Sequence, residues 1–484
     1  MKQYSLLVVI AILVSCTIEI GMALLQLFGL LDSNHNMFAL TGTFPNPGPL
    51  GGYISICISV MFAYYFWGTS KIVRLLCLFV SLSGIIILPS TQSRSAVLAL
   101  VVSVFMMIRK IEVGRYYLQK HGKILLFLGI IAIMFMYIIK KSSADGRVFM
   151  DSISVRIICK NIRGVGPDNF AGAYGEEQFT YFKQNINNAG DCLDWTNLNE
   201  NIRLIADCPD RAYNEYIQIG VEYGLVAMLY FISMIIYCIY ISYERNDYLC
   251  YGLIAFAVFS LFSYPLHLIL FQILFSVFIV SCLIPVVIKG EGTGIILFII
   301  STAICHNCVF SSVKKLEREK KVIKEYNKIE QWYENEYYEY VVEDCKKIFE
   351  EMQNNRFFLF TYGRSLQFVG SYEKSDSILM MGAKVSSDPM FWNVMGNNSL
   401  AQGKYREAEE RYKHAFYMVP NRLYPLYLLA KLYHTEGDSA KFMEMAEKVE
   451  TFIPKVESVN TERLRDEIRK LKSEYLLEAV SKDD

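Results

Sequence analysis

Long apolar segments dominate the first two thirds of the chain and restrict how it can fold. They lie near residues 4–28, 50–68, 72–90, 94–109, 123–140, 213–241, 248–264, 267–288 and 293–312. A helix crosses the bilayer core with about 20 apolar residues. Because lipid offers the backbone no hydrogen bonds, such segments fold as internally bonded helices. We therefore predict an all-α fold whose N-terminal part is a polytopic helical membrane domain of about nine spans.

Charged residues are unevenly distributed and mark a domain boundary. Asp, Glu, Lys and Arg are sparse in residues 1–312 and dense in residues 313–484, while 53% of the whole chain is hydrophobic. That apolar content is high for a soluble protein and fits a membrane domain with a polar domain attached. The formal net charge is zero, so the sequence indicates no nucleic-acid partner.

Basic residues in the short connections set the orientation of the membrane domain. Lys71 and Arg74 separate the second and third segments, and a basic cluster at residues 109–123 separates the fourth and fifth. Residues 29–49, on the opposite side, contain neither Lys nor Arg. The positive-inside rule places the N-terminus in the cytoplasm, and an odd number of spans places the C-terminal domain outside. The large loop 141–212 is then also external, and loops of that length are usually functional.

Cysteine usage indicates no metal site. Cys192 and Cys208 lie in the external loop, where a disulfide between them is possible outside the cytoplasm. The segment from Cys305 to Cys308 lacks the second ligand pair that a zinc site needs. Most other cysteines lie in apolar segments, where the thiol behaves as a small hydrophobic group.

The C-terminal third repeats with a period of 33 to 34 residues. Small residues and prolines recur at or near this spacing: Gly363, Gly396 and Ala430; Gly370, Gly403 and Gly437; Pro389, Pro420 and Pro454. The stretch GKYREAEERYKHAFYMVP is typical of the second helix of a tetratricopeptide-like unit. We predict an α-solenoid of about four such units over residues 313–484, with an irregular helical bundle as the alternative. Its concave face is expected to bind a protein or peptide partner.

A polar stripe precedes the sixth apolar segment. In DCPDRAYNEYIQIGVEYG, residues 207–224, polar side chains recur at helical spacing and share one face. These side chains are Arg211, Asn214, Glu215, Gln218 and Glu222. Such a face is costly in lipid unless it meets water, protein or a charged ligand. We interpret it as a functional face that meets one of these partners. For Glu222, and likewise for Glu19 and Gln26 in the first segment, the alternative is a structural hydrogen bond.

Two arginines are predicted on the outer side of the membrane. Arg94 lies in STQSRSA, before the fourth segment, and Arg156 lies near the start of SVRIICKNIRGVGPDNF. A guanidinium group binds phosphate oxygens in a bidentate manner, so both are candidates for anion binding. For Arg94 the alternative is a side chain that extends to the membrane interface. In GVG, Gly164 and Gly166 permit a tight turn or a close backbone approach to a ligand.

Four motifs together resemble the O-antigen ligase/polymerase superfamily. FALTGTFPNPGPLGGYI, STQSRSA, the helix leading into GVGPDNF, and RAYNEYIQIGVEYG follow the family's order over roughly residues 18–265. Members with C-terminal tetratricopeptide repeats are a familiar variant. The resemblance implies a multi-pass enzyme of the bacterial inner membrane whose repeats lie in the periplasm. Such enzymes move a glycan from a polyprenyl-diphosphate carrier to an acceptor hydroxyl, and they need no metal, nucleotide sugar or other cofactor.

The resemblance also implies roles for single residues. Arg94 and Arg156 match the pair that binds the diphosphate, and Arg211 is expected near the entering phosphates or sugars. Tyr213 stands where the ligase pattern has His before Asn214, and tyrosine, with a reference pKa of about 10, is a poor base. Either Tyr213 only positions the sugar or another group takes the proton. The candidates for that group are Glu215, Glu222 and His267.

Several functions share these motifs. A ligase transfers to the lipid A core, whereas a polymerase transfers to a growing glycan and a protein O-oligosaccharyltransferase transfers to protein. The sequence does not separate them, because acceptor choice depends on the shape of the cavity. The non-enzymatic alternative is a membrane-tethered repeat scaffold in which Tyr213 marks a lost active site.

Overall fold

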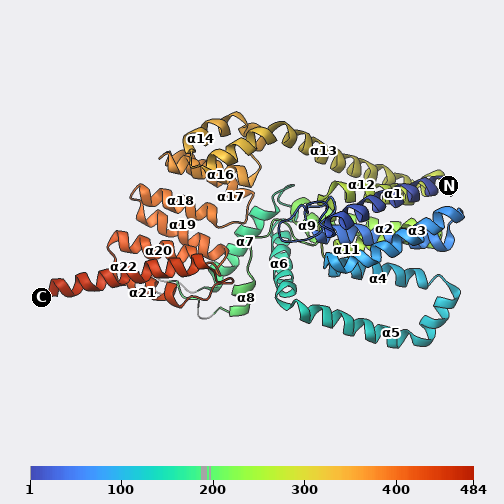
Figure 1. Ribbon diagram of the computed structural model, residues 1–484, viewed down its shortest axis with the longest axis horizontal. Helices are drawn as coiled ribbons and strands as arrows, with labels where there is room; N and C mark the ends of the chain where they lie inside the picture. Colours follow the sequence, from blue (N-terminus) through green and yellow to red (C-terminus); the bar gives the residue numbers. More distant parts are fainter. Residues whose placement is uncertain (1, 187–192, 196–197, 291, 484) are drawn as a thin grey trace. The chain divides into compact units, whose positions relative to one another are not determined.

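The computed structural model describes residues 2–186, 193–195, 198–290 and 292–483, and the regular elements in these ranges are helices (Figure 1). This confirms the predicted all-α fold for the described residues. The chain divides into two compact units. The first unit comprises residues 1–141, 213–219 and 226–314, and the second comprises residues 142–212, 220–225 and 315–484.

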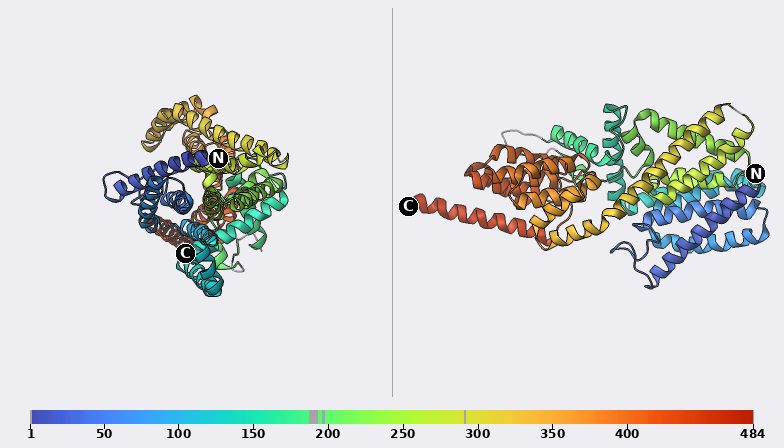
Figure 2. Two further views of the ribbon diagram at one scale, coloured as in Figure 1. Left: turned by 90° about the vertical axis from the view of Figure 1, so that its right-hand side faces the viewer. Right: turned by 90° about the horizontal axis from the view of Figure 1, so that it is seen from above.

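The first unit is built around one central helix. Its elements are α1 (Lys2–Leu27), α2 (Pro47–Trp67), α3 (Lys71–Ile87), η1 (Leu88–Thr91), α4 (Arg94–Ile108), α5 (Glu112–Ile139), α9 (Glu215–Tyr223), α10 (Leu225–Glu244), α11 (Leu249–Ser260), η2 (Pro265–His267), α12 (Ile269–Ile288) and α13 (Gly292–Glu334). Helix α2 packs against α1, α3, α4 and α11, and Figure 2 shows the N-terminal helices of this bundle in blue and cyan. Most residues of α2 are buried. Residues of α9 and α13 belong to both units.

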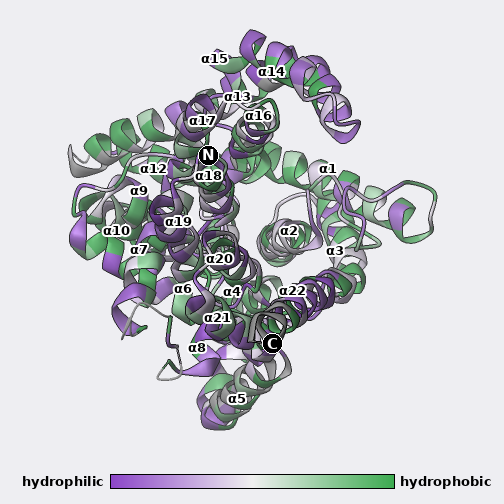
Figure 3. Cartoon of the chain, turned by 90° about the vertical axis from the view of Figure 1, so that its left-hand side faces the viewer, coloured by the Kyte–Doolittle hydropathy of each residue, from purple (hydrophilic) through white to green (hydrophobic). Residues whose placement is uncertain are grey.

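Five helices among the described residues are long and apolar enough to cross a membrane. They are Leu6–Leu27, Pro47–Trp67, Lys71–Thr91, Leu225–Glu244 and Ile269–Ile288, and Arg94–Ile108 and Leu249–Ser260 are apolar but shorter. The apolar character of the first-unit helices is visible in Figure 3. The predicted segments at 123–140 and 293–312 lie within α5 and α13. The count of nine spans therefore stays a prediction.

One predicted span is interrupted. The sequence predicts a single helix over residues 213–241, whereas the chain forms α9 and α10 with Gly224 between them. Gly224 has a φ of 90°, a left-handed value that glycine adopts without steric cost and that cannot continue a helix. Glycine at this position thus ends α9 and allows α10 to begin in a new direction.

The second unit contains paired helices at the spacing of the sequence repeat. Its C-terminal elements are α14 (Tyr338–Lys347), α15 (Phe349–Met352), α16 (Arg356–Phe368), α17 (Tyr372–Lys384), α18 (Met390–Ala401), α19 (Tyr405–Met418), α20 (Tyr424–Glu436), α21 (Ser439–Thr451) and α22 (Val459–Asp483). Helices α16 and α17, α18 and α19, and α20 and α21 pack as pairs. Gly370, Gly403 and Gly437 join the members of these pairs, with φ values of 76°, 72° and 81°. The repeated glycines therefore supply the left-handed turn of each pair.

The loop 141–212, which the sequence predicts to be external and part of the N-terminal domain, belongs almost entirely to the second unit. We keep the name external loop for it. It contains α6 (Lys141–Lys160), α7 (Phe170–Asn185) and α8 (Glu200–Ile205), and α7 packs against α17 and α19. The expected domain boundary after residue 312 lies within α13, close to the unit boundary after residue 314. Local patterns do not reveal which distant helices a loop contacts, so the loop was assigned by position alone. Cys192 lies outside the described residues, as do the side chains of Cys305 and Cys308.

Candidate functional site

Two buried polar side chains of α1 hold the loop that precedes α2. The Gln26 side-chain oxygen accepts the N–H groups of Thr41 and Gly42, both at 2.8 Å. The Glu19 carboxylate accepts the N–H of Thr43 at 3.0 Å and its hydroxyl at 2.5 Å. Buried backbone groups require such partners. Glu19 and Gln26 therefore have structural roles, the second of the two interpretations that the sequence allowed.

Three loops of the first unit meet through Asn46 and two tyrosines. Asn46 caps α2 by accepting the N–H of Gly48 at 3.2 Å, and its side-chain amide donates to the Tyr264 hydroxyl at 2.9 Å. The Tyr264 ring lies edge-on to the Tyr213 ring, with centroids 5.4 Å apart. Tyr213 has a left-handed φ of 50° and keeps 38% of its surface exposed. A strained tyrosine that stays accessible suits contact with a ligand.

A buried carboxylate lies beside a histidine at the same place. Asn214 caps α9 by accepting the N–H groups of Tyr216 at 3.2 Å and Ile217 at 3.3 Å. Glu215 is only 2% exposed and accepts the N–H of Leu266 at 3.1 Å. Its other carboxylate oxygen lies 3.5 Å from Nδ1 of His267. At this distance the contact is an ion pair only when the imidazole is protonated, and the buried Nδ1 has no hydrogen-bond partner among the described residues. A carboxylate that approaches Nδ1 to hydrogen-bond distance would orient the imidazole so that Nε2 can take a proton, as in catalytic triads.

Arg94 lies at the same end of the unit. It is the first residue of α4 and follows Ser93, whose hydroxyl accepts the N–H of Ala96 at 3.4 Å. Helix η1 packs on α2, and Gly51 lies against Thr91 and Ser93 one turn from the start of α2. A cation at a helix N-terminus opposes the helix dipole by about 0.3–1 kcal/mol. The helix dipole therefore does not favour an arginine here, and anion binding by Arg94 stays a prediction.

These residues define what we call the polar end of the first unit. Its members are Asn46, Arg94, Tyr213, Asn214, Glu215, Tyr264 and His267. The first unit thus brings together four of the seven predicted site residues. Tyr264 was not predicted, because only its bond to Asn46 distinguishes it from the many aromatic residues of the apolar segments. Among the described residues, no cluster of His, Cys, Asp and Glu could hold a metal ion.

The other three predicted residues, Arg156, Arg211 and Glu222, belong to the second unit. Arg156 on α6 donates through Nε to Glu177 at 2.8 Å, and Lys160 donates to the other carboxylate oxygen at 2.6 Å. The Glu177 side chain is 8% exposed, whereas those of Arg156 and Lys160 are 40% and 52% exposed. The group keeps a net positive charge on its accessible side. The sequence analysis did not predict Lys160, although its spacing of four from Arg156 places both on one helix face.

The glycines of GVG approach backbone rather than a ligand. Val165 donates its N–H to the carbonyl of Val221 at 2.9 Å, and Gly166 donates to that of Glu222 at 3.0 Å. A Cβ at Gly164 would lie 2.4 Å from the Glu222 carbonyl oxygen. The close backbone approach that the sequence predicts is therefore made to residues 220–225. Glu222 is 6% exposed, and its backbone carbonyl fixes this turn.

Gly224→Ala is expected to destabilise the second unit. A Cβ at Gly224 would lie 2.4 Å from the Ile162 carbonyl oxygen, and the φ of 90° disfavours any other residue. The cost is of order 1–3 kcal/mol for the backbone alone, so the melting temperature of the purified protein in detergent should fall. Gly122→Ala is the matched control, because a Cβ at Gly122 meets nothing within 4 Å. Equal melting temperatures for the two variants would show that this contact is unimportant.

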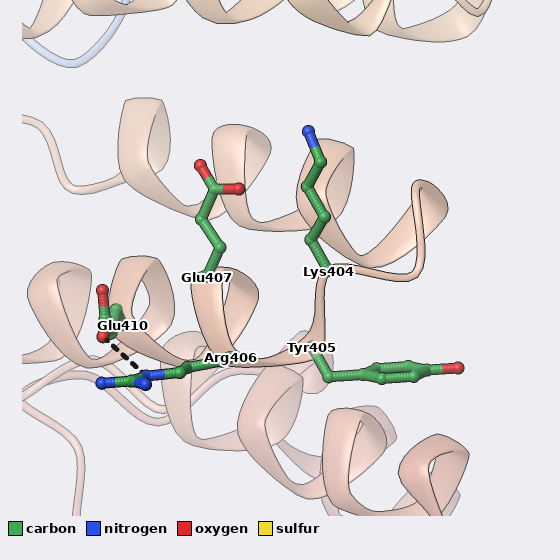
Figure 4. A pocket seen from close by; sticks show the side chains of 5 residues that line it. All are labelled: Lys404, Tyr405, Arg406, Glu407 and Glu410. Carbon is green, nitrogen blue, oxygen red and sulfur yellow. Dashed lines mark ion pairs between the residues drawn. The ribbon is translucent and has the colours of Figure 1, made fainter.

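A shallow surface hollow in the second unit carries no such site. It lies at the start of α19 and is lined by Lys404, Tyr405, Arg406, Glu407 and Glu410. Figure 4 shows these side chains pointing in different directions, and Arg406 forms an ion pair with Glu410 at 3.5 Å. Two cations face two anions there, so the hollow favours no charged ligand.

Comparisons with known proteins do not identify the chain. No protein-family model matches it, and no curated protein matches it.

Proposed function

We propose that this protein is a metal-independent membrane glycosyltransferase of the O-antigen ligase type. It moves a glycan from a polyprenyl-diphosphate carrier to an acceptor hydroxyl. The observation that carries the proposal is the pairing of Glu215 with His267 beside Tyr213. A carboxylate and an imidazole lie together where the ligase pattern otherwise lacks its histidine. The pair supplies the base that a tyrosine does not.

In the proposed reaction, residues of the polar end have distinct roles. The acceptor oxygen attacks the anomeric carbon of the carrier-linked sugar, and the bond from that carbon to the diphosphate oxygen breaks. The acceptor proton passes to Nε2 of His267, which Glu215 orients. The electron pair leaves with the polyprenyl diphosphate, whose developing charge Arg94 stabilises. Tyr213 positions the sugar, and the family resemblance assigns Arg156 to the diphosphate as well.

The topology of the proposal follows the distribution of charge and hydropathy. About nine spans cross the bacterial inner membrane, with the N-terminus in the cytoplasm. The external loop and the tetratricopeptide-like repeats lie in the periplasm. The five helices that meet the length and hydropathy of a span support membrane insertion, and the spacing of Gly370, Gly403 and Gly437 supports the repeats.

Analysis of lipid-linked glycan and lipopolysaccharide in a strain that lacks this protein tests the function. A ligase predicts that long carrier-linked chains accumulate and that lipopolysaccharide loses its O-chains. Accumulation of single repeat units would identify a polymerase instead, and loss of glycan from protein alone would identify a protein glycosyltransferase. Unchanged glycans in all three pools would favour the scaffold and contradict the proposal.

A further inference from the structure

Equivalent residues of three successive repeats bind one stretch of the external loop. Ser387, Asn421 and Lys455 are spaced 34 residues apart, and each follows the second helix of a pair. The Ser387 hydroxyl donates to the Pro209 carbonyl at 3.0 Å. The Lys455 ammonium donates to the Asp207 carboxylate at 2.7 Å. We call this row of inter-repeat residues the docking edge.

Asn421 is the central residue of the docking edge. Its side-chain amide donates to the carbonyls of Arg203 at 3.0 Å, Leu204 at 3.2 Å and Ala206 at 2.7 Å. Asn421 is only 4% exposed, so these bonds are shielded from water. A single carboxamide that bonds three carbonyls holds a defined backbone turn, which an unrelated extended peptide would not reproduce.

The loop also donates hydrogen bonds to backbone carbonyls of the repeats. Arg203, 4% exposed, donates to the Pro420 carbonyl at 3.3 Å and to the Ile453 carbonyl at 2.9 Å. Its guanidinium lies 4.8 Å from the centre of the Phe452 ring. Burial lowers the pKa of Arg203, while Glu200 opposes that shift. Burying the guanidinium group without these carbonyl partners would cost free energy. Arg203 therefore stabilises the binding of the loop to the docking edge.

The docked helix α7 joins the docking edge to the cationic pair of α6. The Gln178 side-chain amide donates to the Asp207 carbonyl at 3.0 Å and to the Met418 carbonyl. The neighbouring Phe179 stacks on His414 at 3.8 Å. Glu177, next to Gln178, forms ion pairs with Arg156 and Lys160 on α6. A continuous set of contacts therefore runs from the repeats through α7 to these two cations.

We infer that the docking edge binds the chain's own loop, and that the repeats thereby hold Arg156 and Lys160 in the arrangement that binds the carrier diphosphate. The binding of the loop to the docking edge does not depend on the proposed function. The role of Arg156 and Lys160 in glycan transfer does rest on the proposed function. The repeats would then act inside the enzyme at this edge, rather than as a receptor for another protein there.

Hydrogen exchange on the full-length protein in detergent tests the docking. In Asn421→Asp, which keeps the shape of the side chain but loses its donors, amides of residues 203–210 should exchange roughly tenfold faster or more. Asn354→Ala is the control, because Asn354 is exposed and lies outside the docking edge. Unchanged exchange in Asn421→Asp would overturn the docking.

Exchanging the charges of Lys455 and Asp207 distinguishes loss of their direct contact from misfolding of the repeat. Burial raises the pKa of Asp207, but Lys455 and the Cys208 N–H outweigh burial and hold it below its ordinary value. Lys455→Asp should therefore speed exchange in the loop, and adding Asp207→Lys should restore protection. A double variant that exchanges as fast as Lys455→Asp alone would refute a direct contact.

Transfer kinetics in the same variants test the positioning role. If the repeats position Arg156 and Lys160, a variant with a released loop should show a raised KM for the carrier-linked donor and a lowered kcat. The charge-reversed double variant should recover both. Released docking with unchanged kinetics would overturn the positioning role and leave the docking intact. If the unaltered protein shows no transfer, the proposed function fails, while the exchange experiment still decides the docking.

Discussion

Arg94→Ala is expected to lower the rate of glycan transfer by about 100- to 1,000-fold, the loss typical when one preorganised donor to developing charge is removed. Arg94→Lys should retain an intermediate rate, because an ammonium keeps the charge but not the planar fork that binds two phosphate oxygens. The rate is measured with a polyprenyl-diphosphate-linked donor and normalised to the protein in the membrane.

Arg109→Ala provides a matched control for Arg94→Ala. Arg109 is exposed and caps the opposite, C-terminal end of the same helix, α4. The Arg109→Ala variant should therefore transfer glycan at the normal rate. The melting temperature separates function from fold: an Arg94→Ala protein that has lost transfer but melts with Arg109→Ala has lost a functional group rather than its structure. Full transfer by Arg94→Ala would support a side chain that merely extends to the membrane interface.

His267→Gln is expected to lower transfer by about 100- to 10,000-fold, the range for loss of a general base. Glu215→Gln keeps an oxygen to accept the Leu266 N–H, so it tests the charge rather than the packing. It should also lower transfer. Because the two side chains act as one base, the double variant should be little worse than His267→Gln alone. The measurement is the same donor-to-acceptor assay.

His306→Gln is the control for the histidine. His306 lies on α13, and its exposed side chain stacks on Phe310. It is not part of the Glu215–His267 pair to which the base is assigned. It should transfer at the normal rate. If His267→Gln is fully active and Tyr213→Phe is inactive, the base has been assigned to the wrong residue. Multiplied effects in the Glu215 and His267 double variant would show that the two act independently.

Local sequence was sufficient to predict the helices. Among the described residues, five of the apolar runs form helices long enough to cross a bilayer, and glycines at a period near 34 supply left-handed turns. Both features can be recognised without knowledge of the fold. The polar stripe also predicted Asn214 and Glu215 at the start of a helix. It failed to predict the break at Gly224, because a glycine inside an apolar run does not by itself indicate its φ.

The grouping of the site residues depended on contacts between distant segments. Glu215 meets His267, and Glu177 holds Arg156, across separations that no periodic pattern spans. The sequence predicted that the glycines of GVG permit a tight turn or a close approach to a ligand, and only the fold showed that they lie against the backbone of residues 220–225.

The sequence by itself determined the all-α fold of the described residues, the apolar character of the N-terminal helices and the 33- to 34-residue spacing of the turn glycines. Only the tertiary structure decided that the external loop belongs with the repeats and that Asn421 binds it. The physical reason is that helix formation depends on side chains a few residues apart, whereas Asn421 bonds to backbone carbonyls, which every residue possesses and which leave no trace in the sequence.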